Sequence, residues 1–273
     1  MTAVSPVHRQ FGSKARTAPK ILSLVPAGKR VWVEVFAGSA AVTLAKPPHP
    51  VEHINDLSGH VINLFKVVRD QDSSLALQNA IAMTPYHQGE LALCRSEIRH
   101  ADPVEWARRF LVVSWLSVNG CHTGNTGFRL NRDQKWHLGV FNRLPERIAA
   151  VCQRLKEVTI HQRHCLDVVK VFGDLPDAVL FLDPPYPMET TNTQRQQVYE
   201  VDMDAQEHAA LASALRGVKA SVIITMNPGT VYSEILADWH VTPLPVRGLR
   251  NAVKTELILT NFVPEAGLFG GEA

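Results

Sequence analysis

The sequence has 273 residues, the length of one large domain or of a domain that carries an insertion. Hydrophobic residues make up 45% of the chain and charged residues 20%, so a sizeable core can form and general disorder is excluded. No apolar run reaches the roughly 18 residues that span a membrane. The segment from Met1 to Lys14 also lacks the apolar stretch of a signal peptide, so we expect a cytoplasmic protein without membrane association.

Basic side chains are concentrated in two segments, although the net charge is only +2. Residues 1–30 carry six Lys and Arg and no acidic residue, and residues 81–160 carry eleven Lys and Arg against seven Asp and Glu. An excess of this size fits an ordinary solvated surface as well as a phosphate-binding one. The charge pattern therefore permits a nucleic-acid partner without requiring it.

The four cysteines are widely spaced, at positions 94, 121, 152 and 165, and form no Cys-x-x-Cys pair. This spacing favours reduced core thiols over disulfides or a zinc site. His161 and His164 precede the last cysteine, but this run falls at a predicted strand end and not in a ligand-spaced knuckle. We therefore expect no bound metal.

Strand-like and helix-like segments alternate along the chain. Short stretches rich in apolar and β-branched residues predict strands at 30–36, 51–55, 158–161, 179–182, 220–225 and 256–261. Helix signals stand between them at 40–46, after the potential cap Ser58, at 167–172 and after the capping-box pair Asp204 and Glu207. This alternation predicts an α/β fold with a mostly parallel central sheet.

The middle of the chain has a different pattern. Between about 75 and 157, helical stretches at 91–99 and 103–116 are followed by a Gly- and Asn-rich loop at 119–132. We therefore predict a mainly helical inserted domain at 75–157, and a sheet-containing domain formed by 1–74 and 158–273.

A turn of small residues, Phe36 to Ala40, follows the first predicted strand. Such turns let the backbone approach a nucleotide at the carboxyl end of a parallel strand. Only Gly38 of a Gly-x-Gly-x-x-Gly fingerprint is present, and packing alone could explain the turn. Asp56 follows the second strand, where its carboxylate could bind ribose hydroxyls or cap a helix.

The sharpest signal is Asp183-Pro184-Pro185-Tyr186, directly after the apolar strand at 179–182. Prolines cannot continue a central strand and fix the backbone at its end. The Asp183 carboxylate and the Pro184 carbonyl can then converge as hydrogen-bond acceptors beside the aromatic ring of Tyr186. This combination favours the binding of a planar amine over a purely structural turn.

These motifs resemble the Dam-type N6-adenine DNA methyltransferases, whose signatures are Asp-Pro-Pro-Tyr and the cofactor loop Phe-x-Gly-x-Gly. The chain also has the family's order, with the cofactor loop first, then an insertion, then Asp-Pro-Pro-Tyr. The resemblance spans most of the length. It implies a Rossmann-like S-adenosylmethionine-dependent methyltransferase fold in which the insertion is the target-recognition domain.

The cofactor that this resemblance implies is S-adenosylmethionine, and an acid at the position of Asp167 lies beside the cofactor adenine in that family. The residues that match the family's cofactor segments are Phe11, Gly12, Lys14, Glu34, Phe36, Ala37, Gly38, Ser39, Asp56, Asp167 and Asp183. Two positions depart from the pattern. Val35 stands where proline is frequent, and Ala40 replaces the second glycine, which would crowd the loop and affect cofactor affinity if φ there must be positive.

The implied reaction is methyl transfer to the N6 amine of a flipped-out adenine in DNA. Asp183 and the Pro184 carbonyl would each accept one N–H bond and so localise the nitrogen lone pair, while Tyr186 stacks on the base. Our candidates for DNA contacts are polar residues of the insertion and of the C-terminal part, namely Asn119, Arg129, Arg132, Lys135, Arg247 and Arg250.

Other targets fit the same acceptor geometry. N4 of cytosine or an RNA base remains open, as does an inactive nucleic-acid-binding relative, whereas a dehydrogenase leaves Asp183 to Tyr186 without a role. The resemblance also allows a restriction endonuclease counterpart and a protein that acts at the bacterial nucleoid or comes from a virus. The recognition sequence and the oligomeric state are left open.

Overall fold

The computed structural model describes residues 3–120, 126–130, 136–186, 200–247 and 253–264. Within these ranges seven strands form one sheet in the order β3-β2-β1-β4-β5-β7-β6. Strands β1 to β5 are parallel, whereas β7 runs antiparallel to both β5 and β6. The strands are β1 (Val31–Glu34), β2 (Val51–Asn55), β3 (Val158–His161), β4 (Ala178–Leu182), β5 (Ser221–Met226), β6 (His240–Arg247) and β7 (Val253–Thr260).

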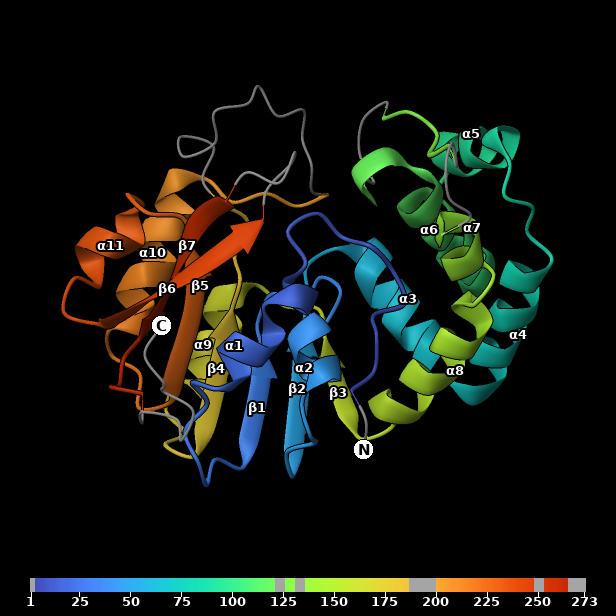
Figure 1. The fold of residues 1–273 in the computed structure, drawn as a ribbon. Coiled ribbons are helices and arrows are strands. Elements are labelled where there is room, and N and C mark those ends of the chain that lie inside the picture. Colours follow the sequence, from blue (N-terminus) through green and yellow to red (C-terminus); the bar gives the residue numbers. More distant parts are fainter. Residues whose placement is uncertain (1–2, 121–125, 131–135, 187–199, 248–252, 265–273) are drawn as a thin grey trace.

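Helices cover the sheet and form a separate group beyond β3 (Figure 1). Those next to the sheet are η1 (Lys14–Arg16), α1 (Ala18–Leu22), α2 (Ala41–Ala45), α9 (Cys165–Phe172), α10 (Ala205–Leu215) and α11 (Val231–Ile235). The group beyond β3 consists of α3 (Gly59–Arg69), α4 (Gln71–Ala82), α5 (Gln88–Ser96), α6 (Pro103–Leu116), η2 (Val118–Gly120), α7 (Trp136–Phe141) and α8 (Leu144–Leu155).

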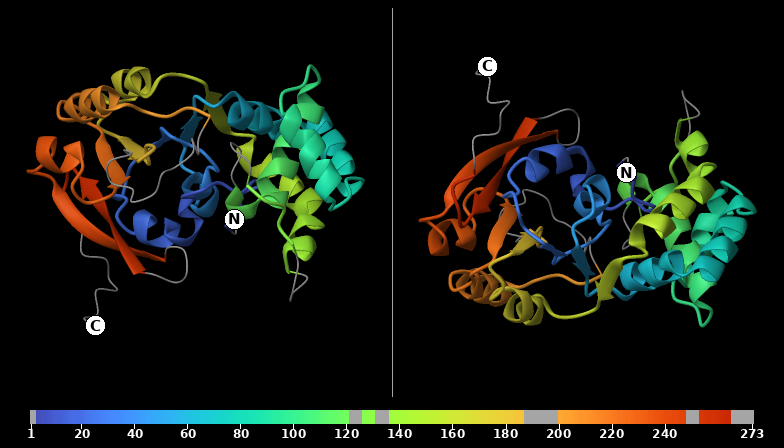
Figure 2. Two further views of the ribbon diagram at one scale, coloured as in Figure 1. Left: turned by 90° about the horizontal axis from the view of Figure 1, so that it is seen from above. Right: turned by 90° about the horizontal axis from the view of Figure 1, so that it is seen from below.

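Each face of the sheet has its own apolar core because successive strand residues point to opposite faces. On one face Val33 and Val35 pack with residues of α9, α10 and α11. On the other, Trp32 packs with Phe181 and with residues of α1 and α2. Figure 2 shows these two helical layers on either side of the strands. The mostly parallel α/β fold expected from the sequence is confirmed.

The edge strand β6 was not among the predicted strands. It contains Pro243 and Pro245, and proline removes a backbone donor from a hydrogen-bonded ladder. Because β6 lies at the end of the sheet and pairs only with β7, it tolerates both prolines.

The insertion is helical in its described part, as predicted, but its core is continuous with that of the sheet. Phe65 of α3 and Ile54 of β2 belong to the same apolar cluster as Leu77, Phe110 and Leu144 of the helical group. Helix α4 begins at Gln71, four residues before the predicted domain boundary at 75. The division into 1–74 with 158–273 and 75–157 stays a prediction.

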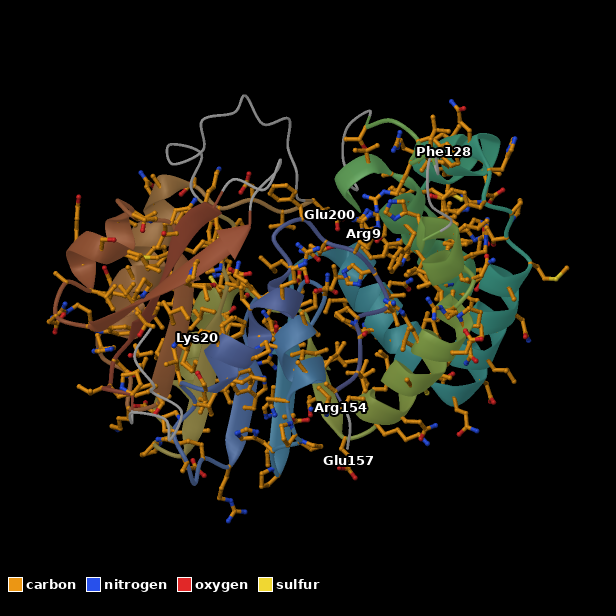
Figure 3. All side chains as sticks on the ribbon, in the orientation of Figure 1. Arg9, Lys20, Phe128, Arg154, Glu157 and Glu200 are labelled. Atoms are coloured by element: carbon orange, nitrogen blue, oxygen red, sulfur yellow. The ribbon has the colours of Figure 1, made fainter. Side chains whose placement is uncertain are left out.

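An ion pair also ties the insertion to the sheet. Arg154 of α8 donates to both carboxylate oxygens of Glu52 on β2, at 2.9 Å for Oε1, and to the Thr43 carbonyl at 3.0 Å. Figure 3 labels Arg154 near the amino ends of the strands, away from Arg9 and Glu200. No helix within the described ranges is long and apolar enough to cross a bilayer.

Candidate active site

A cavity of about 1280 Å³ opens at the carboxyl ends of the parallel strands. Its lining includes the loops after β1, β2 and β4 and the N-terminal segment around Phe11. Strand order reverses between β1 and β4, since the chain proceeds from β1 outward to β2 and β3 and then returns to β4. A crevice at such a switch point is where open α/β sheets bind ligands.

The loop after β1 depends on a glycine. Gly38 has φ of 47°, and a Cβ placed there would lie 2.8 Å from Nε2 of Gln10. The loop is held on one side by the Ala37 N–H, which donates to the Asn55 carbonyl at 2.8 Å. On the other side the Ser39 and Ser13 hydroxyls are 2.8 Å apart, which joins the N-terminal segment to this loop.

Ala40, which stands where the family pattern has a second glycine, adopts the left-handed conformation that favours glycine. Its φ is 51° and ψ is 32°, and among the described residues it is the only non-glycine with positive φ. The side chain is fully buried in the apolar cluster shared with α3 and does not line the cavity. The backbone therefore bears the strain, and the alanine methyl does not crowd the ligand space.

Asp56 braces two loops of the cavity. Its Oδ2 accepts from the Gly38 N–H at 2.7 Å, and its Oδ1 accepts from the Ser58 N–H at 2.8 Å. Burial raises the pKa of this carboxyl above its usual range, against the opposing effect of the backbone donors. Helix α3 is capped by Ser58 and not by Asp56, so the helix cap weighed from the sequence is not formed by this carboxylate. Asp56 lines the cavity, and its binding of ribose hydroxyls stays a prediction.

Glu34 is a buried acid in the cavity wall. Its Oε2 accepts from the Thr43 N–H at 2.9 Å and from the Thr43 hydroxyl at the start of α2. Burial raises the pKa of Glu34 to about 7, because these hydrogen bonds offset only part of the lost solvation. Near neutral pH this carboxyl is thus close to its titration midpoint.

Asp183 is anchored through one oxygen. Its Oδ1 accepts from the Thr225 hydroxyl at 2.6 Å and lies 2.9 Å from Nζ of Lys14. Within the described chain, both of these contacts fall on Oδ1, and the side chain lines the cavity with 21% of its surface exposed. Two donors on one oxygen fix the plane of the carboxylate and leave Oδ2 to accept a hydrogen bond from a ligand.

Lys14 is the centre of the polar cluster. Besides Asp183, its ammonium contacts the Tyr186 hydroxyl at 3.0 Å, the Gly12 carbonyl at 3.2 Å and Oε2 of Glu256 at 3.4 Å. Burial by itself lowers the pKa of Lys14, but the two carboxylates outweigh it and raise the pKa above its ordinary value. Lys14 is therefore a buried cation.

Tyr186 remains a neutral phenol. Burial, together with the negative charges of Asp183 and Glu256, raises its pKa well above the ordinary value. The Lys14 ammonium lies 5.0 Å from the centroid of its ring, a distance at which a cation is attracted to the π face. The ring is consequently fixed beside Asp183 at the cavity wall.

Glu200 connects the cavity to the insertion. Its Oε2 accepts from the Ser58 hydroxyl at 2.6 Å, and its Oε1 accepts from the Arg99 guanidinium at 2.8 Å. Burial would raise the pKa of Glu200, but the bonds from Ser58 and Arg99 lower it. Figure 3 labels Glu200 close to Arg9, between the sheet and the helical group.

The cavity brings together nearly all of the predicted catalytic and cofactor residues. Asp183 to Tyr186 line it, as do ten of the eleven cofactor candidates, namely Phe11, Gly12, Lys14, Glu34, Phe36, Ala37, Gly38, Ser39, Asp56 and Asp183. Asp167 is the exception, because it lies exposed in the first turn of α9 and outside the cavity lining.

Of the predicted DNA contacts, Arg129 is fully described, and it does not line the cavity. The backbone of Asn119 lies in η2, next to the lining residue Gly120, and Arg247 ends β6. Arg129 is partly buried in the insertion, with Nη1 3.4 Å from Nδ1 of His137. Arg132, Lys135 and Arg250 fall outside the described residues.

Several cavity residues were not selected from the sequence. They are Glu200, Glu256 and the basic residues Arg9, Arg16 and Arg163. Thr225, which is buried behind the lining and anchors Asp183, was not selected either. Glu256 and Thr225 could have been noticed in the sequence. Glu256 is an acid at the start of one predicted apolar strand, and Thr225 carries a hydroxyl at the end of another. Arg9 and Arg16 belong to the basic segment noted at residues 1–30. Glu200 and Arg163 carried no signal in one sequence.

Within the described ranges, no group of three or more His, Cys, Asp or Glu side chains is arranged so that it could hold a metal ion. The site instead combines carboxylates and hydroxyls with basic side chains, among them Lys14, around the ring of Tyr186. These groups can bind a cation and orient an amine through hydrogen bonds.

Comparison with known proteins gave one family match. Residues 11–241 match the family described as D12 class N6 adenine-specific DNA methyltransferase. Curated protein sequences gave no significant match. Among solved structures, the chain is similar to the rRNA methyltransferase AviRa from Streptomyces viridochromogenes, with 14% identity over 94% of this chain and 86% of that chain and a TM-score of 0.35. A likeness of this size does not bear on the activity.

Proposed function

The chain belongs to the D12 class of N6 adenine-specific DNA methyltransferases, and we propose that its cavity binds S-adenosylmethionine beside an adenine flipped out of duplex DNA. One observation carries this proposal. The Asp183 carboxylate lies in the cavity with Oδ1 anchored by Lys14 and Thr225 and with no partner for Oδ2 within the described chain. An acceptor so arranged can orient an exocyclic amine.

The cavity fits a nucleoside cofactor in size and charge. A volume of about 1280 Å³ exceeds the roughly 300–1,000 Å³ of a typical single-ligand pocket, which leaves space for a second ligand. Because Gly38 has no side chain, a ligand can approach the backbone of the loop after β1 closely. Carboxylates of Glu34, Asp56 and Glu200 line the wall, where they suit the hydroxyl and cationic groups of such a molecule.

We assign the cofactor to the residues that the family resemblance selected, from Phe11 to Ser39, with Asp56 for the ribose hydroxyls. Asp167 has a weaker case, since it lies outside the cavity lining. When bound, S-adenosylmethionine supplies an electrophilic methyl group on a sulfonium. The protein contributes the binding geometry and the electrostatics of the acceptor side.

Asp183 and Pro184 would direct the target nitrogen. The lone pair of an adenine amine is delocalised into the ring, so the amine is a poor nucleophile. If Oδ2 of Asp183 and the Pro184 carbonyl each accept one N–H, the nitrogen becomes more tetrahedral and its lone pair points away from both acceptors. The ionised carboxylate also stabilises the positive charge that grows on nitrogen during transfer.

Tyr186 would hold the flipped base. N6 of a stacked, paired adenine cannot enter a cavity, so the base must leave the helix at a cost of a few kcal/mol. The Tyr186 ring, fixed by Lys14, can stack on the extruded base and recover part of this cost. Arg9, Arg16, Arg163 and Lys254 line the cavity and add positive charge that suits DNA phosphates.

The test is a methylation assay with duplex DNA and labelled S-adenosylmethionine, followed by mass spectrometry of the digested nucleosides. We expect N6-methyladenine with the wild type and at least about a 1,000-fold lower rate with Asp183→Ala. The matched control is Asp174→Ala, which removes an aspartate that is 75% exposed and whose one ion pair within the described ranges is with the exposed Lys219.

Circular dichroism and calorimetry with S-adenosylmethionine should show that the Asp183 variant is folded and still binds the cofactor. N4-methylcytosine in place of N6-methyladenine would change the assigned base. Full activity of Asp183→Ala would refute the acceptor role of this carboxylate.

A further inference from the structure

Glu256 is a second carboxylate beside Asp183, and the reaction described above does not use it. Strand β7 runs antiparallel to β5, so the start of β7 lies at the carboxyl ends of the parallel strands. This topology brings Glu256 into the cavity wall, with 15% of its side chain exposed. A carboxylate is costly to bury unless it is paired, so its partner shows what it does in the site.

Glu256 forms an ion pair with Lys14, and its carboxylate also hydrogen-bonds with Tyr186. Four acceptors surround the Lys14 ammonium, which has only three N–H groups, and the carboxylates of Asp183 and Glu256 are two of these four. The Asp183 oxygen is nearer, at 2.9 Å, and the Glu256 oxygen is at 3.4 Å. Lys14 is 6% exposed, so solvent screens these charges weakly.

The cluster of Lys14, Asp183 and Glu256 has a formal charge of −1. With Lys14 and Asp183 alone it would be zero, and the ammonium would fully neutralise the carboxylate that has to accept the amine. A neutralised carboxylate is a weaker acceptor and stabilises a growing positive charge less well. The second carboxylate restores the negative charge without displacing Lys14 from Oδ1.

We propose that Glu256 is a positioning residue for the methyl transfer, which shares the Lys14 ammonium with Asp183 and thereby keeps the Asp183 carboxylate negative toward the cavity. This inference rests on the proposed function of Asp183. It differs from a structural role, because Glu256 would act through its charge on Lys14, whereas its hydrogen bond with Tyr186 needs only an acceptor oxygen.

The variant Glu256→Gln keeps the shape and removes the charge. We expect kcat to fall by about 10-fold to 100-fold, with an unchanged thermal unfolding temperature. Glu234→Gln is the matched control, because it removes the same charge from an exposed position on α11 and should keep wild-type kcat.

A double-mutant cycle tests whether Glu256 acts through Lys14. Lys14→Met will itself lose activity, and adding Glu256→Gln to it should change kcat by less than about twofold, since no ammonium is left to share. If Glu256 instead contacted the substrate by itself, the two losses would multiply, and the inference would be wrong.

A binding measurement tests the effect of the Glu256 charge without the need for turnover. Calorimetry of Glu256→Gln should show a ratio of affinities for S-adenosylmethionine over the uncharged thioether S-adenosylhomocysteine that is about threefold to tenfold lower than in the wild type. An unchanged ratio together with wild-type kcat would overturn the inference while the proposed function stands. Absence of adenine methylation by the wild type would instead contradict the proposed function, and the affinity ratio would still decide the charge role of Glu256.

Discussion

Charged side chains of helices α5 and α6 pair with one another, whereas several at the carboxyl edge of the sheet face a shared cavity. In the insertion, Arg108 donates to Glu105 and Glu90, both at 2.6 Å, and none of these three residues lines the cavity. The pKa of Glu105 is lowered to about 2, first by the bond from Arg108. Such pairs stabilise the ionised forms.

Two acids of the cavity have the opposite character. Burial raises the pKa values of Glu34 and Asp56, and the backbone at Ala40 is held at positive φ. These features lower stability, and they gather where ligands bind. The comparison teaches that the insertion is built for stability and the sheet edge for chemistry, and changes made in each region should therefore affect different measurements.

The largest expected effect is the contribution of Glu34 to the pH dependence of the free energy of unfolding. Its pKa is about 7 in the folded protein against an ordinary value of 4.5, so the folded state holds the proton more tightly. The corresponding stabilisation is present below about pH 4.5 and is lost as the pH rises through 7. At 1.36 kcal/mol per pKa unit, the loss amounts to about 3 kcal/mol.

Glu34→Gln cannot lose this proton. The difference in free energy of unfolding between variant and wild type should therefore shift in favour of the variant by about 3 kcal/mol between pH 4.5 and 8, as measured by urea denaturation. Burial lowers the pKa values of His8 and His53 to about 4, which gives an opposite slope, but that slope is common to both proteins and cancels in the difference. A difference that does not vary with pH would contradict the buried carboxyl.

A smaller effect is expected in the insertion. Arg108→Met leaves Glu105 and Glu90 without their shared cation, and these pairs are only partly buried, with side-chain exposures of 25% and 17% for the two acids. We expect a loss of about 2 kcal/mol in the free energy of unfolding. At saturating DNA, kcat should be unchanged, because Arg108 does not line the cavity. A drop in kcat without a drop in stability would break the division between the two regions.

The smallest effect is expected at Ala40. Replacing it by glycine relieves a left-handed alanine, which costs roughly 1–2 kcal/mol, but also removes a buried methyl and loosens the unfolded chain. The free energy of unfolding should therefore change by less than about 1 kcal/mol. Affinity for S-adenosylmethionine in calorimetry should stay within about twofold, because the methyl lies in the core and not in the cavity. A large gain in affinity would show that the alanine does crowd the site.

Local sequence determined the parallel part of the fold well. Strands β2 and β3 and helix α6 have the predicted bounds, and the Ser58 cap and the Asp204 capping box are both present. Apolar periodicity and capping residues act within a few positions of the chain, so they can be recognised without the tertiary structure. Helices α4 and α8 were not predicted as separate elements, and β6 was hidden by its prolines.

For the site, the motif Asp183 to Tyr186 and the turn at Gly38 could be recognised from the sequence, because rigid prolines and a small-residue turn after apolar strands leave a local mark. Only the tertiary structure decided that Lys14 lies between Asp183 and Glu256 and that Glu200 reaches both Ser58 and Arg99. It also showed that Asp167 is not among the residues that line the cavity. These relations join residues far apart in the chain, and they follow from strand order and from the antiparallel direction of β7, which no local pattern encodes.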